Sequence, residues 1–183
     1  MSASLAQLRD LIQQRFPSAA APVFKESAPA SDSPALLPGR LVEIVGPTSG
    51  LVLQRFIHGQ RTALVDGADA FDPAGIDPAD LQRLLWVRCR KAAEAIRAAD
   101  LLLRDGNLPA VLLDLRPLPQ RDLLSLPTSI WHRLRMLAER GDAAAAVFSP
   151  CKVVTCAARR WFQTQEHTLA DLEPHGEALG LAA

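Results

Sequence analysis

Short, almost continuous apolar runs alternate with amphipathic segments from Pro38 onward. Runs of this kind are typical of strands buried on both faces of a parallel sheet. They predict strands at 41–45, 62–66, 84–88, 110–115, 143–149 and 152–161. Apolar positions at helical spacing predict helices at 51–57, 78–83, 91–104 and 129–140. This alternation predicts an α/β fold, a mostly parallel sheet flanked by helices.

Two of these helices carry signals for their ends. Gly106 lies just past the helix at 91–104, where a glycine in left-handed conformation commonly ends a helix. Thr128 or Ser129 is expected to cap the last helix, and Gly141 is expected to stop it.

The first 35 residues follow a different pattern. Residues 2–16 read as an amphipathic helix, and residues 17–34 read as a flexible linker rich in proline, alanine and serine. We therefore divide the chain into an N-terminal helical arm with its linker (1–35), a core (36–162) and a polar tail (163–183), which we expect to be largely unstructured. The apolar positions of the arm are Leu5, Leu8, Ile12, Phe16, Val23 and Phe24.

Composition excludes several classes of function. The 183 residues are 49% hydrophobic and 22% charged with zero formal net charge, so no global field attracts nucleic acid or anionic lipid. No apolar run is long enough for a membrane span and no signal peptide is evident, so we expect a cytoplasmic protein without a membrane partner. The three cysteines and four histidines show no ligand spacing, and we expect no metal site.

The segment LLPGRLVEIVGPTSG (36–50) has the layout of a strand entering a phosphate-binding loop. A working loop needs G-x-x-x-x-G-K-[ST], whose lysine and hydroxyl serve the phosphates and Mg²⁺. Counted from Gly46, those last three positions hold Leu51, Val52 and Leu53. We expect no cofactor at this degenerate loop, and we expect the three apolar side chains to pack into the core. The loop residues are Gly46, Pro47, Thr48, Ser49 and Gly50.

These segments in series resemble the RecA family. TALVDGADAFDP (62–73) is similar to its second strand and the loop with the catalytic glutamate, and AEAIRAADLLLRDGNLPAVLLDL (93–115) is similar to its helix and Walker B strand. Ala68 replaces the glutamate, and Asp69 follows it. Asp66 and Asp114 remain as vestigial acids. The resemblance therefore implies a RecA-like fold that is not an ATPase.

The stretch LLWVRCRKAAEAIRAADLLLRDGNLPAVLLDLRPLPQRDL (84–123) resembles the ImuA family of degenerate RecA relatives. That resemblance implies a non-catalytic accessory protein of the bacterial SOS response, which supports translesion synthesis together with RecA and a polymerase-like partner, ImuB. Two alternatives stay open: a SulA-like division inhibitor that binds FtsZ, and a residual nucleotide-binding ATPase.

Candidate interaction residues come from the RecA resemblance and from the positions of basic residues. The N-terminal arm is similar to the RecA segment that docks onto a neighbouring subunit, which implies contact with RecA or with a second copy of this chain. Basic residues at strand ends, Arg88 and Arg90 in one place and Arg159 and Arg160 beside aromatic residues in another, are candidates for nucleic-acid contact. The competing interpretation is that the first pair is solvated at the start of a helix, and that the second pair ends a strand whose aromatic side chains pack on the core.

Overall fold

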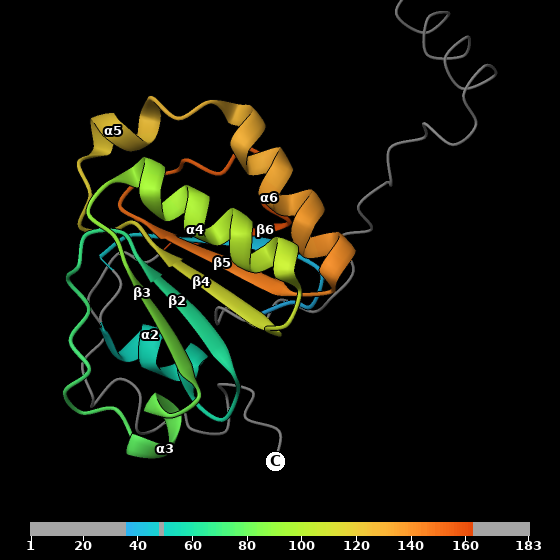
Figure 1. The fold of residues 1–183 in the computed structure, drawn as a ribbon. Helices are drawn as coiled ribbons and strands as arrows, with labels where there is room; N and C mark the ends of the chain where they lie inside the picture. The colour runs from blue at the N-terminus through green and yellow to red at the C-terminus, as the bar shows by residue number, and fades with distance from the viewer. Residues whose placement is uncertain (1–35, 48–49, 163–183) are drawn as a thin grey trace, which may run out of the picture. The chain divides into compact units, whose positions relative to one another are not determined.

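The computed structural model describes residues 36–47 and 50–162 (Figure 1). This part of the chain forms a six-stranded sheet in the order β3-β2-β4-β5-β1-β6, and every neighbouring pair of strands is parallel. The α/β fold class is therefore confirmed. The strands are β1 (Leu41–Val45), β2 (Thr62–Asp66), β3 (Leu84–Arg88), β4 (Ala110–Asp114), β5 (Ala144–Ser149) and β6 (Arg159–Phe162).

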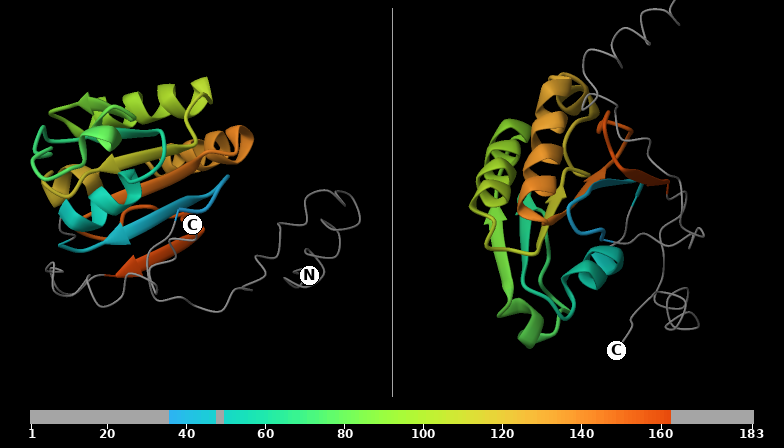
Figure 2. Two further views of the ribbon diagram at one scale, coloured as in Figure 1. Left: turned by 90° about the horizontal axis from the view of Figure 1, so that it is seen from below. Right: turned by 90° about the vertical axis from the view of Figure 1, so that its right-hand side faces the viewer.

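Helices cover both faces of this sheet. The two longest helices pack side by side on one face, and α2 lies on the opposite face (Figures 1 and 2). Two short helices complete the described elements. The helices are α2 (Gly50–Ile57), α3 (Pro78–Leu81), α4 (Ala92–Asp105), α5 (Gln120–Leu124) and α6 (Thr128–Gly141).

The apolar runs of the sequence become the four inner strands. Every residue of β1, β2, β4 and β5 is buried, because helices cover both sides of these strands. Alternate residues enter separate cores: Leu41 of β1 joins α4 and α6, whereas Val42 and Ile44 join α2. The edge strand β3 is only partly covered, and Leu85 is 46% exposed.

Glu43, in the middle of the apolar strand β1, is fully buried. Its Oε1 accepts hydrogen bonds from the Val153 and Val154 amides at 2.7 and 3.0 Å and from the Ser149 hydroxyl at 3.1 Å. Its Oε2 accepts from Nε of Arg160, and Arg160 also donates to the Val154 carbonyl. A single carboxylate thus fixes the connection between β5 and β6.

Several predicted boundaries need correction. The strand expected at 152–161 forms only at 159–162, because the amides of Val153 and Val154 bond to the Glu43 side chain. The helix α5 was not predicted, since five residues carry too little periodicity.

The predicted ends of the two long helices were right for α4 and wrong for α6. Gly106 ends α4 in left-handed conformation, as predicted. The expected caps of α6 were wrong: Thr128 already lies inside the helix, and Asp142 (φ +50°) takes the left-handed position assigned to Gly141. The side chain of Asp142 tolerates that conformation better than most non-glycine residues.

The expected arm and its docking residues (Leu5, Leu8, Ile12, Phe16, Val23 and Phe24) lie outside the described residues, as do 163–183. None of the helices in the described ranges has the length and apolar character needed to cross a bilayer.

Replacing Glu43 with Gln should lower the free energy of unfolding by about 3–5 kcal/mol, because the partner charge on Arg160 stays largely buried. Urea unfolding measures the effect. Asp122→Asn, in an exposed pair with Arg121 at 3.3 Å, is the matched control and should cost about 1 kcal/mol or less. The double variant Glu43→Met/Arg160→Met should recover much of the loss. Equal stabilities of Glu43→Gln and the control would contradict this assignment.

Candidate functional site

The carboxyl ends of parallel strands are where α/β proteins bind ligands, and the degenerate loop lies there. Gly46 follows β1, adopts φ +130° and donates its amide to the Ser149 carbonyl at 3.0 Å. Pro47 is exposed, and Thr48 and Ser49 lie outside the described residues. The helix α2 then starts at Gly50. The strand and the helix expected on either side of a phosphate-binding loop are therefore present.

The residues that follow the loop do not carry its chemistry. Leu53, at the position of the hydroxyl residue, is fully buried and packs with Phe56 and Ile57 against the sheet. Phe56 contacts Phe148 of β5 edge to face, with ring centroids 5.7 Å apart. The prediction that Leu53 joins the core is confirmed. The side chains of Leu51 and Val52 lie outside the described part.

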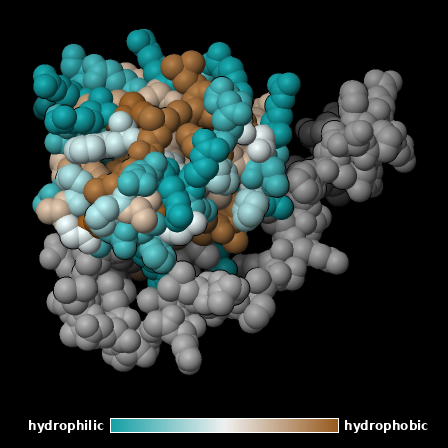
Figure 3. All heavy atoms as spheres, turned by 60° about the horizontal axis from the view of Figure 1, so that its bottom comes forward, coloured by the Kyte–Doolittle hydropathy of each residue, from teal (hydrophilic) through white to brown (hydrophobic). Residues whose placement is uncertain are grey.

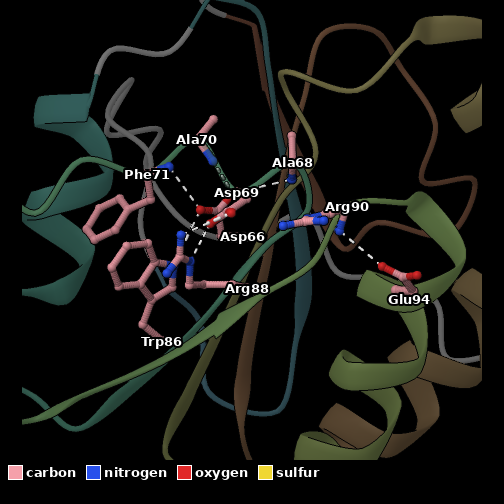
Figure 4. A network of polar contacts seen from close by, with 9 residues as sticks. All are labelled: Asp66, Ala68, Asp69, Ala70, Phe71, Trp86, Arg88, Arg90 and Glu94. Atoms are coloured by element: carbon pink, nitrogen blue, oxygen red, sulfur yellow. Dashed lines mark hydrogen bonds and ion pairs between the residues drawn. The ribbon is translucent and has the colours of Figure 1, made fainter.

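Asp66 ends β2 and organises the loop behind it (Figure 4). Its carboxylate accepts hydrogen bonds from the amides of Ala68, Ala70 and Phe71 at 3.3, 3.0 and 2.9 Å. Trp86 of the neighbouring strand donates its indole Nε1–H to the same carboxylate at 3.3 Å. With 1% of its surface exposed, Asp66 acts here as an internal acceptor that shapes the loop.

Asp114 ends β4 and pairs with a cation of its own chain. Arg116 donates from Nε to Oδ1 at 2.8 Å and from Nη2 to Oδ2 at 2.5 Å. The two side chains are 17% and 5% exposed, so this pair is largely withdrawn from water. The guanidinium also lies over the Phe148 ring, 5.7 Å from its centroid. The acid at the Walker B position is thus neutralised internally.

Ala68 and Asp69 occupy the loop that would carry a catalytic glutamate. Asp69 adopts φ +55° and forms a two-point ion pair with Arg88 at the end of β3, with Nη2–Oδ2 at 3.0 Å (Figure 4). The hydrogen bond from Arg88 holds the pKa of the Asp69 carboxyl below its usual value, and the pKa of Arg88 is raised in turn. The Arg88 guanidinium also lies 5.1 Å from the centroid of the Trp86 ring. Asp69 is therefore the ion-pair partner of Arg88.

The candidate nucleic-acid residues fall into two separate groups. Arg88 and Arg90 lie at the end of β3, and Arg159 and Arg160 lie on β6, so the pairs occupy opposite edges of the sheet. The backbone amide of Arg90 donates to Glu94 at the start of α4, 3.0 Å away. Any nucleic-acid contact through these residues stays a prediction, and a single continuous patch does not include all four.

The two arginines of β6 have different surroundings. Arg160 binds Glu43, whereas the Arg159 guanidinium lies 5.1 Å from the centroid of the Trp161 ring. Trp161 is 8% exposed and belongs to the core under α2, while Phe162 is 65% exposed. Of the two aromatic residues beside these arginines, only Phe162 is exposed to solvent.

Sequence reasoning missed Glu43 and Arg116. A glutamate in the middle of the strand LVEIV is a signal for a buried, partnered charge. Arg116, two residues after Asp114, is a signal for a local ion pair. Within residues 36–47 and 50–162, no group of three histidine, cysteine or acidic residues could hold a metal ion.

Comparisons with known proteins connect this arrangement to RecA. No protein-family model matches the chain. RecA of Rubrobacter xylanophilus is 35% identical in an alignment 86 residues long, which covers 42% of this chain. The chain is similar to RecA over that stretch. The match spans only a quarter (25%) of the RecA chain. Among solved structures, the RadB recombinase superposes with a TM-score of 0.49 at 18% identity, covering 62% of each chain.

Asp66→Asn should lower the free energy of unfolding by about 1.5–3 kcal/mol, since it removes a charged acceptor from buried donors. Amide exchange should accelerate at Ala70 and Phe71, measured by hydrogen–deuterium exchange. Asp72→Asn, whose exposed carboxylate accepts from the Ala74 amide at 2.9 Å, serves as the control. Addition of Mg²⁺ should leave the melting temperature of the unmodified protein unchanged. A Mg²⁺-dependent rise that Asp66→Asn abolishes would show a metal ligand instead.

Proposed function

We propose that this chain is a non-catalytic, RecA-like accessory protein of the bacterial DNA-damage response, of the ImuA type and cytoplasmic. Two observations support the relationship: the sequence similarity to RecA over 86 residues and the ImuA-like pattern of residues 84–123. In this proposal the protein supports mutagenic translesion synthesis through contacts with other proteins.

The observation that carries the proposal is the internal use of every acid at the candidate nucleotide site. Asp66 holds its own loop, Asp114 pairs with Arg116, and Asp69 pairs with Arg88. The hydroxyl position holds Leu53 in the core. Phosphoryl transfer relies on a lysine, a hydroxyl-bound Mg²⁺ and a group that orients water. The residues that stand at these places serve the fold, which favours a role in binding over a role in catalysis.

The proposed partners are RecA, an ImuB-like polymerase homologue and, through the N-terminal arm, a second copy of this chain. The arm carries four apolar residues at helical spacing and the pair Val23-Phe24. Burying such side chains supplies several kcal/mol, which after association costs corresponds to contacts of about micromolar affinity. Because the core lacks the nucleotide that would hold the next RecA subunit, growth of a RecA assembly would stop at this protein.

The first prediction is that the purified protein neither binds nor hydrolyses ATP. The site lacks both the cation that would clamp the phosphates and the base that would orient water. Isothermal titration calorimetry should show no heat of ATP binding, and phosphate release should equal the blank with and without single-stranded DNA. Micromolar ATP binding would favour the residual ATPase, and its loss in Asp114→Asn would locate the site.

The second prediction is that deleting residues 1–24 abolishes binding to RecA and leaves the melting temperature nearly unchanged. Biolayer interferometry on immobilised RecA measures binding, and calorimetry measures melting. A variant with Leu5, Leu8, Ile12 and Phe16 replaced by alanine should lose binding as the deletion does. Its matched control replaces Gln7, Gln13 and Gln14 by alanine and should bind normally. Full RecA affinity of the deletion variant would refute docking through the arm.

A third measurement separates the ImuA-type role from the division-inhibitor alternative. The full chain, immobilised in equal amounts, is incubated with purified ImuB homologue or with purified FtsZ. We expect retention of the ImuB homologue and no retention of FtsZ. Retention of FtsZ alone would replace the proposed role by the SulA-like one.

A further inference from the structure

The outer sides of α4 and α6 enclose an open groove of about 540 Å³. Its floor is apolar, and Leu101 stands on its wall with 60% of its surface exposed. Figure 3 shows that apolar side chains also reach the surface in patches bordered by hydrophilic residues. The lining includes Ile96, Arg97, Asp100, Leu101, Arg104 and Arg133.

The charges around this groove are unbalanced. Asp100 pairs with Arg104 of its own helix and with Arg133 of α6, whose Nη2 lies 3.1 Å from Oδ2. Three arginines against one aspartate leave two positive charges along the groove. Arg97 is exposed and forms no ion pair within residues 36–47 and 50–162. A ligand of this groove should therefore combine apolar side chains with negative charge.

The chain itself contains such a segment directly after β6. Residues 163–183 hold four acidic residues (Glu166, Asp171, Glu173, Glu177), no lysine or arginine, and four leucines (Leu169, Leu172, Leu179, Leu181). The alternative segment within the chain, residues 1–24, carries two arginines and one aspartate and has the same sign of charge as the groove. Charge complementarity thus favours the acidic segment over the arm.

We propose that the acidic segment, residues 163–183, docks in cis into the groove between α4 and α6. The leucines cover the apolar floor, and the carboxylates face Arg97 and the other groove arginines. The proposal is independent of the role assigned to the N-terminal arm.

The topology supports this connection. The strands are parallel, so their carboxyl ends lie on one side of the sheet. Since α4 and α6 lead back to the beginnings of strands, both helices start on the side where β6 ends. Residues 163–168 can span about 20 Å when extended, at roughly 3.3–3.6 Å per residue. A tethered segment has an effective concentration of about millimolar, so that even a weak groove contact becomes populated within one molecule.

Photo-crosslinking of the full chain tests the proposal. Leu101 is replaced by p-benzoylphenylalanine, and after irradiation the tryptic fragments are identified by mass spectrometry. No lysine or arginine follows Arg160, so the whole acidic segment lies in one tryptic fragment that starts at Trp161. We expect a crosslink from position 101 to this fragment. The same probe at Leu124, which is 63% exposed and outside the groove, should give no such product.

Charge variants test the complementarity. Arg97→Glu should reduce the crosslink yield several-fold, and so should replacement of the four acidic residues by glutamine. Arg140→Glu, an exposed position of α6 outside the groove, should leave the yield unchanged. A mixture of ¹⁴N- and ¹⁵N-labelled chains should give crosslinks within one label only. Mixed-label pairs, crosslinks to residues 1–24, or no crosslink to the acidic segment would each overturn the proposal.

Discussion

The buried carboxylate of Glu43 is the constraint on which the described fold depends most. It lies in β1, between β5 and β6, and it receives donors from the segment that joins those two strands. A charge in such surroundings is costly unless every acceptor site is satisfied. Ser149, two backbone amides and Arg160 supply those donors. The last strand is therefore held to the sheet by electrostatics as well as by its own ladder.

The same solution recurs at the carboxyl edge of the sheet. Asp66, Asp69 and Asp114 each find donors within the chain, from backbone amides, Arg88 and Arg116 respectively. A carboxylate whose oxygens already accept hydrogen bonds from its own chain gains little free energy from binding a metal ion or a water molecule. The charges at this edge of the sheet therefore stabilise its loops.

Sequence patterns predicted most of the sheet because burial on both faces leaves a clear signature. The buried runs at 41–45 and 62–66 became strands with those bounds. Patterns failed where a distant side chain decides the backbone, as in the segment that bonds to Glu43, which was expected to be a strand. They also failed at α5, which is too short to show a period.

For the candidate site, the sequence alone determined which residues follow the loop, because Leu51, Val52 and Leu53 stand at the positions that a working loop gives to glycine, lysine and a hydroxyl residue. It also located Asp66 and Asp114 at strand ends. Only the tertiary structure decided what these acids do, because their partners come from other strands and from loop backbone whose course no local pattern fixes. The separation of Arg88 from Arg160 was likewise decided by strand order, because β3 and β6 form opposite edges of the sheet.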